Sequence, residues 1–137
     1  MPTVQDVMTT DPVALEASKP VIEAAKRMRD EDIGDVIVME GGGICGVVTD
    51  RDIVVRVVAN GRDPAQTPLG DVCSRDVATV SPGDDLTVAG DLMRDRAIRR
   101  VPVVEDGRPV GIISIGDLAI ERDPDSALSH ISAAPPS

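Results

Sequence analysis

The chain has 137 residues, 42% of them hydrophobic, with a formal net charge of -10 and no Phe, Tyr or Trp. This length provides for one domain, or for two half-sized units that share a core, and excludes a large multidomain enzyme. The acidic balance and the lack of aromatic stacking platforms argue against nucleic acid as a partner. No apolar run is long enough for a bilayer and no secretory signal is visible, so we expect a cytoplasmic protein with no membrane partner.

The first predicted elements are a short extended piece at residues 12–15 and a helix that follows it. Ser18 is the expected helix cap, and Pro20 is tolerated in the first turn. Apolar residues recur at helical spacing over residues 21–28. The equivalent extended piece and helix in the second half are expected at residues 77–80 and from about residue 86.

A two-stranded hairpin follows each of these helices. The strands are predicted at residues 35–40 and 44–49 in the first half, and at residues 100–105 and 110–114 in the second. The first hairpin turns through Gly41-Gly42-Gly43 and the second through Asp106-Gly107, because glycine suits the tight turn of a hairpin. A further helix begins near Asp50 and another near Ile115, which makes each half a β-α-β-β-α unit.

The two halves are copies of one repeat. A shift of 65 residues aligns residues 4–54 with residues 69–119 without a gap and pairs identical residues at 14 positions. A unit of about 55 residues buries little apolar surface alone. The predicted fold class is therefore α+β, with two β-α-β-β-α motifs packed sheet to sheet with pseudo-two-fold symmetry.

The expected organisation has four parts. They are a first motif at residues 1–60, a linker at residues 61–68, a second motif at residues 69–122 and a flexible tail at residues 123–137. Asn60-Gly61 is a good helix stop, and Pro, Ser and Ala dominate the tail. His130, the single histidine, lies in that tail, so the sequence provides no metal or acid–base site around it.

One motif with functional chemistry ends each hairpin, namely Gly-hydrophobic-hydrophobic-Thr/Ser-x-x-Asp. It reads Gly46-Val-Val-Thr49-Asp-Arg-Asp52 in the first copy and Gly111-Ile-Ile-Ser114-Ile-Gly-Asp117 in the second. At a strand-to-helix junction the carboxylate can accept both ribose hydroxyls, while the hydroxyl and the helix N-terminus favour a phosphate. Alternatively, Thr49 and Asp50 merely cap the helix.

Occurring twice at equivalent places of the repeat, this motif resembles the CBS domain, named after cystathionine beta-synthase, in its usual tandem pair. The resemblance extends over about residues 4–122. It implies clefts that bind adenosyl ligands such as AMP, ADP, ATP or S-adenosylmethionine, with no cofactor required. It also implies a role in regulating another protein and pairs that often dimerise.

In this family the motif of one copy completes a cleft whose other wall is the early strand and hairpin start of the other copy. The nucleotide-binding cleft implied in this way comprises Thr49, Arg51, Asp52, Val77, Ala78, Ile98, Arg99, Arg100 and Pro102. The pair Arg99-Arg100 matches the basic pair that meets phosphates in the family, and guanidinium groups offer paired donors to phosphate.

A second, weaker cleft is implied by the reverse combination of the copies. It comprises Pro12, Val13, Ile33, Gly34, Asp35, Ile37, Ser114 and Asp117. Here Asp35 stands at the position where the other copy has Arg100, and Ile37 stands where it has Pro102. Gly116 stands at the position of Arg51. Because an unpaired carboxylate near a phosphate weakens binding, we expect this cleft to be empty or to hold a less negative ligand.

The two cysteines are too few for a disulfide scaffold or a four-ligand zinc site. Cys45 is expected to be a small buried hydrophobe in its strand. Cys73 takes the place of Met8 in the first copy, and a redox or metal role for it is a minor alternative.

The leading hypothesis is a non-catalytic regulatory module that binds adenine nucleotides and acts through a partner or its dimer state. The alternative is a stress-associated interaction protein with vestigial clefts. No nucleophile–base pair, P-loop lysine motif or histidine cluster supports an enzyme. We also expect a homodimer whose apolar surface comes from the helix faces around residues 21–28 and 86–93. The regulated partner and the preferred adenosyl ligand stay open.

Overall fold

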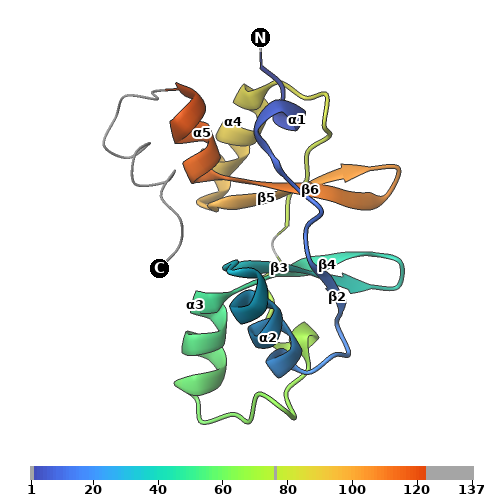
Figure 1. Cartoon of the computed structure of the whole chain (residues 1–137), viewed down its shortest axis with the longest axis vertical. Coiled ribbons are helices and arrows are strands. Elements are labelled where there is room, and N and C mark those ends of the chain that lie inside the picture. The colour runs from blue at the N-terminus through green and yellow to red at the C-terminus, as the bar shows by residue number, and fades with distance from the viewer. Residues whose placement is uncertain (1, 76, 123–137) are drawn as a thin grey trace. The chain divides into compact units, whose positions relative to one another are not determined.

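The computed structural model describes residues 2–75 and 77–122 and contains two three-stranded sheets with helices, which confirms the α+β class (Figure 1). The chain divides into two compact units. The central unit is Val13–Val77, and the terminal unit combines residues 2–12 with residues 78–122. The predicted tail at residues 123–137, with His130, lies outside the described residues.

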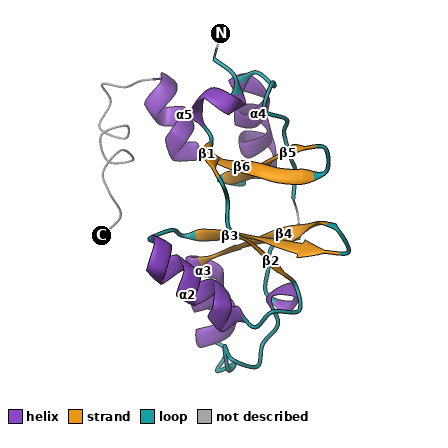
Figure 2. Ribbon diagram, turned by 45° about the vertical axis from the view of Figure 1, so that its right-hand side comes forward, coloured by secondary structure: helices purple, strands orange, loops and turns teal. Residues whose placement is uncertain are grey.

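The central unit contains one sheet of order β2-β3-β4, in which β2 is parallel to β3 and β3 is antiparallel to β4 (Figure 2). Its elements in chain order are β2 (Ala14–Glu16), α2 (Val21–Glu31), β3 (Asp35–Glu40), β4 (Gly43–Thr49), α3 (Asp50–Ile53), a π-helical stretch η1 (Val54–Val58) and a 3-10 turn η2 (Leu69–Asp71).

The terminal unit contains the second sheet, of order β1-β6-β5, with both pairings antiparallel. Its elements are α1 (Val4–Val7), β1 (Thr9–Thr10), α4 (Leu86–Arg96), β5 (Arg100–Glu105), β6 (Arg108–Ser114) and α5 (Ile115–Arg122). Both units thus carry a hairpin between two helices, as the repeat predicts.

Both hairpins turn at two residues with positive φ. These are Gly41 and Gly42 at 61° and 81°, and Asp106 and Gly107 at 53° and 77°. Such a turn matches the right-handed twist of the flanking strands, which is why glycine is favoured there. The hairpin prediction is confirmed, although Gly43 belongs to β4 rather than to the turn.

The predicted helix cap at Ser18 is wrong. Helix α2 begins at Val21 behind an extended Pro20, and no side chain caps it. The backbone N–H groups of Val21 and Ile22 instead donate to the carbonyls of Thr67 and Pro64, at 2.8 and 3.0 Å. The predicted linker therefore supplies acceptors for the unpaired donors of the helix N-terminus. In the second copy, by contrast, the Asp85 side chain caps α4 by accepting the Thr87 N–H.

The two repeats exchange their N-terminal segments. In the terminal unit Thr9 of β1 pairs with Ile112 of β6. In the central unit Ser74, the repeat equivalent of Thr9, forms the corresponding bridge to Val47, the repeat equivalent of Ile112. The compact units are therefore offset from the sequence repeat, since each includes a segment that the sequence assigns to the other copy. The extended piece expected at residues 77–80 makes one bridge, from Val80 to Val103.

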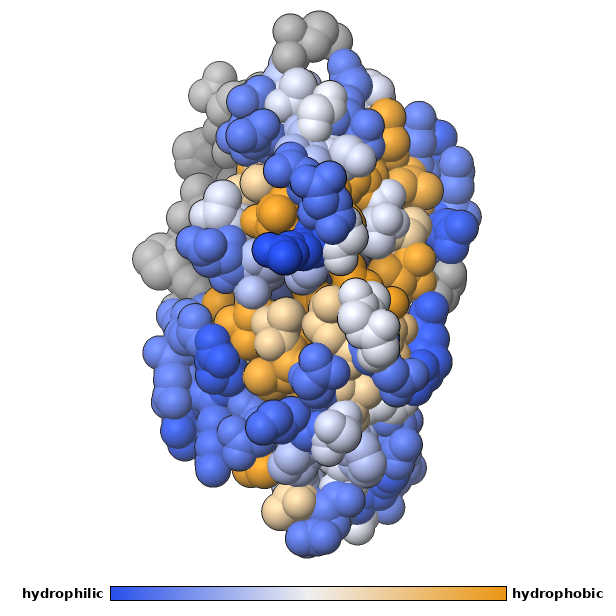
Figure 3. Space-filling view, turned by 90° about the vertical axis from the view of Figure 1, so that its right-hand side faces the viewer, coloured by the Kyte–Doolittle hydropathy of each residue, from blue (hydrophilic) through white to orange (hydrophobic). Residues whose placement is uncertain are grey.

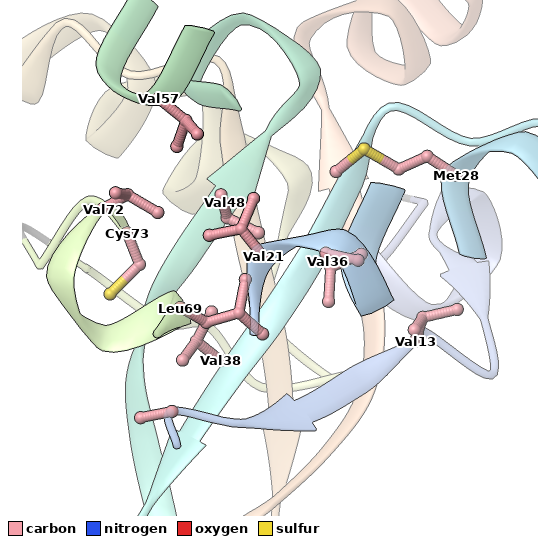
Figure 4. Packing of buried hydrophobic residues seen from close by; sticks show 12 residues of the cluster. Val13, Val21, Met28, Val36, Val38, Val48, Val57, Leu69, Val72 and Cys73 are labelled. Atoms are coloured by element: carbon pink, nitrogen blue, oxygen red, sulfur yellow. The ribbon is translucent and has the colours of Figure 1, made fainter. Parts of the chain in front are cut away.

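Each unit has its own apolar core, filled without aromatic side chains. Figure 4 shows the core of the central unit. Val21, Ala24 and Met28 of α2 are buried in the central core. The equivalent stripe of α4 is buried in the terminal core. These buried stripes pack within their own units, whereas Val88 on α4 is exposed. The expected homodimer surface on the two helices stays a prediction.

The surface is mostly hydrophilic on the face drawn in Figure 3, with apolar patches between the polar areas. In the described part of the chain, the exposed large hydrophobic residues are Val54, Val55, Val58, Val88 and Ile115. Three of them lie on η1, so apolar surface gathers there rather than on α2. Among the described residues, no helix has the length and apolar character needed to cross a membrane.

Candidate functional site

The first copy of the Thr/Ser-x-x-Asp motif lies where β4 ends and α3 begins. Thr49 is the N-cap residue of α3, and its Oγ1 accepts the Asp52 N–H at 3.1 Å. The Asp52 Oδ2 in turn accepts the Thr49 N–H at 2.9 Å. This reciprocal pair is a capping box, which satisfies two free donors of the helix end.

The second copy has the same geometry at the junction of β6 and α5. The Ser114 N–H donates to the Asp117 Oδ2 at 2.8 Å, and the Asp117 N–H donates to the Ser114 Oγ at 3.2 Å. The capping interpretation of the motif is thus realised in both copies. The partner of Thr49 is Asp52, however, and not the Asp50 named in that interpretation.

The cap also fixes the Asp52 carboxylate in one orientation. Its Oδ2 is held by the Thr49 backbone, and its Oδ1 lies 3.8 Å from the Nε of Arg56. The Asp52 side chain is 17% exposed. A carboxylate that is fixed but still reachable can accept hydrogen bonds from a ligand with little loss of its own conformational freedom.

Within the central unit the motif lies beside the start of β3. Asp35 is the register partner of Thr49, and the Asp50 N–H donates to the Gly34 carbonyl at 3.1 Å. Ile33 is half-buried against the central core, and Val13 and Ile37 are buried. A carboxylate at Asp35 makes this neighbourhood of the motif acidic.

Within the terminal unit the motif lies beside a basic pair. Arg100 is the register partner of Ser114, and the Ile115 N–H donates to the Arg99 carbonyl at 2.9 Å. Arg99 is exposed and Arg100 is half-buried. The structure therefore brings Arg99 and Arg100 together with Ser114 and Asp117.

The other predicted residues take the following places. Pro102 is buried in β5, Val77, Ala78, Ile98 and Pro12 are half-buried, and Arg51 is exposed. The two predicted clefts each combine residues of the central unit with residues of the terminal unit, and these combinations stay predictions.

Arg56 is a candidate residue that the sequence analysis missed. Besides its approach to Asp52, its Nη1 donates to the carbonyls of Val72 and Cys73, at 3.0 and 3.4 Å. It thus connects the motif with the segment that follows η2. The spacing of four residues between Asp52 and Arg56 on a helix is the signal that could have indicated this pair.

The two cysteines meet in the central unit, which the sequence analysis did not anticipate. Their Sγ atoms lie 3.7 Å apart, and both thiols are free. Cys73 is buried, whereas Cys45 is only half-buried, so the expectation of a buried Cys45 is not met in full. Across the described ranges, no three His, Cys, Asp or Glu side chains gather in a way that could hold a metal ion.

An open pocket of about 390 Å³ lies in the terminal unit between α4 and α5. Its lining residues are Gly90, Met93, Arg94, Ile115, Leu118 and Ala119. None of these residues belongs to the predicted nucleotide site, although Ile115 lies within the second Thr/Ser-x-x-Asp motif.

Comparison with known proteins identifies the class. The family model for the CBS domain matches twice, at residues 4–59 and at residues 69–122. These matches cover most of the chain and coincide with the two sequence repeats. The chain belongs to the CBS-domain family, as the repeated motif predicted.

The relatives include proteins of similar length. The CBS domain-containing protein YhcV of Bacillus subtilis is 38% identical over 136 residues, which cover 96% of each chain. The crystal structure of Hypoxic Response Protein I with two coordinated zinc ions is 30% identical, with a TM-score of 0.75 over 88% of this chain and 99% of that one.

A third similarity concerns a structure with bound ligands. The CBS domain pair of protein MJ0100, in complex with 5′-methylthioadenosine and S-adenosyl-L-methionine, has a TM-score of 0.79 at 23% identity. It covers 92% of this chain and 99% of that chain. At this level of identity the similarity establishes the fold.

Proposed function

We propose that the protein is a non-catalytic regulatory module that binds an adenosyl ligand and acts through a protein partner or its own assembly state. The observation that carries the proposal is the Asp52 carboxylate, which the capping box holds in a fixed, reachable position at a strand-to-helix junction. Membership of the CBS family supports it, as does a CBS pair of the same fold that holds adenosyl compounds.

The proposed site combines a ribose contact with a phosphate contact. Asp52 accepts the ribose hydroxyls, with Thr49 and Arg51 next to it at the start of α3. Arg99 and Arg100 supply the positive charge for a phosphate, and Val77, Ala78, Ile98 and Pro102 supply apolar surface for the base. The residues of the ribose contact and those of the phosphate contact are assigned to one ligand on the basis of the family resemblance.

A panel of AMP, ADP, ATP, NAD and S-adenosylmethionine in a thermal-shift assay tests this function. A ligand that binds only the folded state raises the melting temperature.

A second candidate is an interaction protein with vestigial clefts, and the capping boxes favour it because they satisfy the hydroxyl and carboxylate groups without a ligand. That candidate predicts no shift with any member of the panel.

Asp52→Asn is expected to weaken binding of AMP about tenfold or more, since hydrogen bonds to a charged group contribute about 1.5 to 3 kcal/mol. Asparagine keeps an oxygen that can accept the Thr49 N–H, so the capping box and the fold should survive. Asp50→Asn is the matched control, because it removes the same charge from an exposed neighbour. Equal affinities of the Asp52→Asn and Asp50→Asn proteins in calorimetry would remove the assigned ribose contact.

We further expect one strong site per chain. The proposed strong site contains Arg51, Arg99 and Arg100, where the second has Gly116, Gly34 and Asp35. The double variant Arg99→Ala, Arg100→Ala should weaken the binding of AMP at least tenfold and lessen the salt dependence of that binding. It should leave the affinity for adenosine nearly unchanged. Asp117→Asn should change the affinity for AMP and the affinity for adenosine by no more than about twofold. A titration that gives two equal sites per chain would contradict this assignment.

A further inference from the structure

The two cysteines are held next to each other by a backbone pairing within the central unit. Cys45 lies on β4, and Cys73 lies in the segment that follows η2. Two residues after Cys45 and one residue after Cys73, Val47 and Ser74 exchange two backbone hydrogen bonds, of 2.9 and 3.1 Å. These bonds fix the two segments side by side, with the Sγ atoms 3.7 Å apart. A bond between the sulfurs would therefore require only a small movement.

The two thiols have different surroundings. Cys73 is 5% exposed and packs among Leu69 and Val72 of the central core (Figure 4). Cys45 is half-buried, and the Nη1 of Arg75 donates to its Sγ at 3.0 Å. The same guanidinium is anchored by the Gly70 carbonyl, which accepts from Nη2 at 2.7 Å. Partial exposure beside a fixed positive charge is the environment in which cysteines react with oxidants.

Burial, and to a lesser extent the hydrogen bond with Cys45, raises the pKa of the Cys73 thiol to about 11. At neutral pH this sulfur therefore keeps its proton. The inner thiol is thus unsuited to attack a dissolved oxidant first, and it suits the second step of a two-step oxidation.

We propose that Cys45 and Cys73 form a reversible dithiol–disulfide site whose oxidant is a hydroperoxide. In the first step the Cys45 sulfur attacks the terminal oxygen of the hydroperoxide, the O–O bond breaks, and an alcohol or water leaves after taking up a proton. Cys45 then carries a sulfenic acid. In the second step the Cys73 sulfur attacks the Cys45 sulfur and forms the S–S bond. The departing hydroxide takes the Cys73 proton and leaves as water.

Two electrons pass from the two sulfurs to the peroxide in this sequence. A dithiol such as dithiothreitol returns them by thiol–disulfide exchange, which regenerates both thiols. The disulfide would tie β4 to the segment after η2 across a sequence separation of 28 residues. A cross-link over such a separation restricts the unfolded chain, so the oxidised protein should melt at a higher temperature.

The experiment compares the full chain before and after treatment with hydrogen peroxide. We expect the mass to fall by about 2 Da and both free thiols to disappear together. We expect the melting temperature to rise by about 10 °C. Dithiothreitol should reverse all three changes. Arg75→Gln should slow the oxidation without preventing it, because the sulfur contacts lie within the central unit and do not depend on this side chain.

Cys45→Ser and Cys73→Ala are the matched controls. In each variant the remaining thiol should stay reduced or be oxidised irreversibly. The mass should not fall by about 2 Da, and the melting temperature should not rise. The proposal is overturned if peroxide leaves both wild-type thiols free, or if it yields sulfinic acid at Cys45 while Cys73 stays reduced. Disulfide-linked dimers on a non-reducing gel, in place of the intramolecular product, would overturn it equally.

Discussion

Gly46→Ala is expected to lower the free energy of unfolding by about 3 kcal/mol or more. A Cβ atom at this position would lie 2.3 Å from the Ser74 carbonyl oxygen and 2.8 Å from the Cys73 Sγ. The carbonyl cannot turn away without losing the hydrogen bond from the Val47 N–H. The substitution therefore forces β4 apart from the segment that follows η2, which Val47 and Ser74 join.

Gly43→Ala is the control for this prediction. Gly43 lies on the same strand, and a Cβ atom there would meet nothing within 4 Å. We expect its effect to stay within about 0.5 kcal/mol. Urea unfolding followed by far-UV circular dichroism measures both variants. If the two alanine variants proved equally stable, the close approach of Ser74 to β4 would be refuted.

Leu69→Ala is expected to lower the free energy of unfolding by about 3 to 4 kcal/mol, which is typical for a large side chain removed from a close-packed core. Leu69 is fully buried in the central core, although the sequence repeat assigns it to the second copy. Its repeat equivalent, Val4, is fully buried in the terminal core. The variant thus tests the exchange of segments as well as the packing.

Val58→Ala serves as the comparison for Leu69→Ala, because Val58 also lies in the central unit but is 64% exposed. It should change the free energy of unfolding by less than about 0.5 kcal/mol. A loss below about 1 kcal/mol for Leu69→Ala, measured in the same urea titrations, would show that this segment does not complete the central core.

The features that the sequence predicted well are local. The hairpins follow from glycine at positive φ between two alternating runs, and β3 and β5 have the predicted bounds. The helix cap failed because the acceptors for α2 come from residues 64 and 67, more than forty positions along the chain. No local pattern around Ser18 carries that information.

The exchange of segments has a signal in the sequence, namely the glycine that begins each Thr/Ser-x-x-Asp motif. Gly46 and Gly111 are identical in the repeat, and the family resemblance assigns both to the ligand motif. Each in fact makes room for a neighbouring segment, since a Cβ atom on Gly111 would lie 2.5 Å from the Met8 Sδ. A glycine in a strand often marks such a close approach of another backbone.

The candidate site was predictable in the same uneven way. The pairing of Thr49 with Asp52 is local, and the three-residue spacing of a capping box predicts it. The contact between Cys45 and Cys73 was not predictable, because it depends on a pairing between β4 and a segment beyond η2. Combinations of residues from the two copies rest on the family resemblance and await the binding experiments.

The exchanged strand β1 also has a consequence for the order of folding during synthesis. Every residue of the central unit has been made once Val77 is added, so that unit can fold while the rest is still being translated. Thr9 and Thr10 have left the ribosome long before, but their partners Ile112 and Gly111 come near the end of the described chain. The first strand to be synthesised is therefore the one that waits longest for its partner, and a ribosome that stalls before β6 leaves it with an unpaired edge.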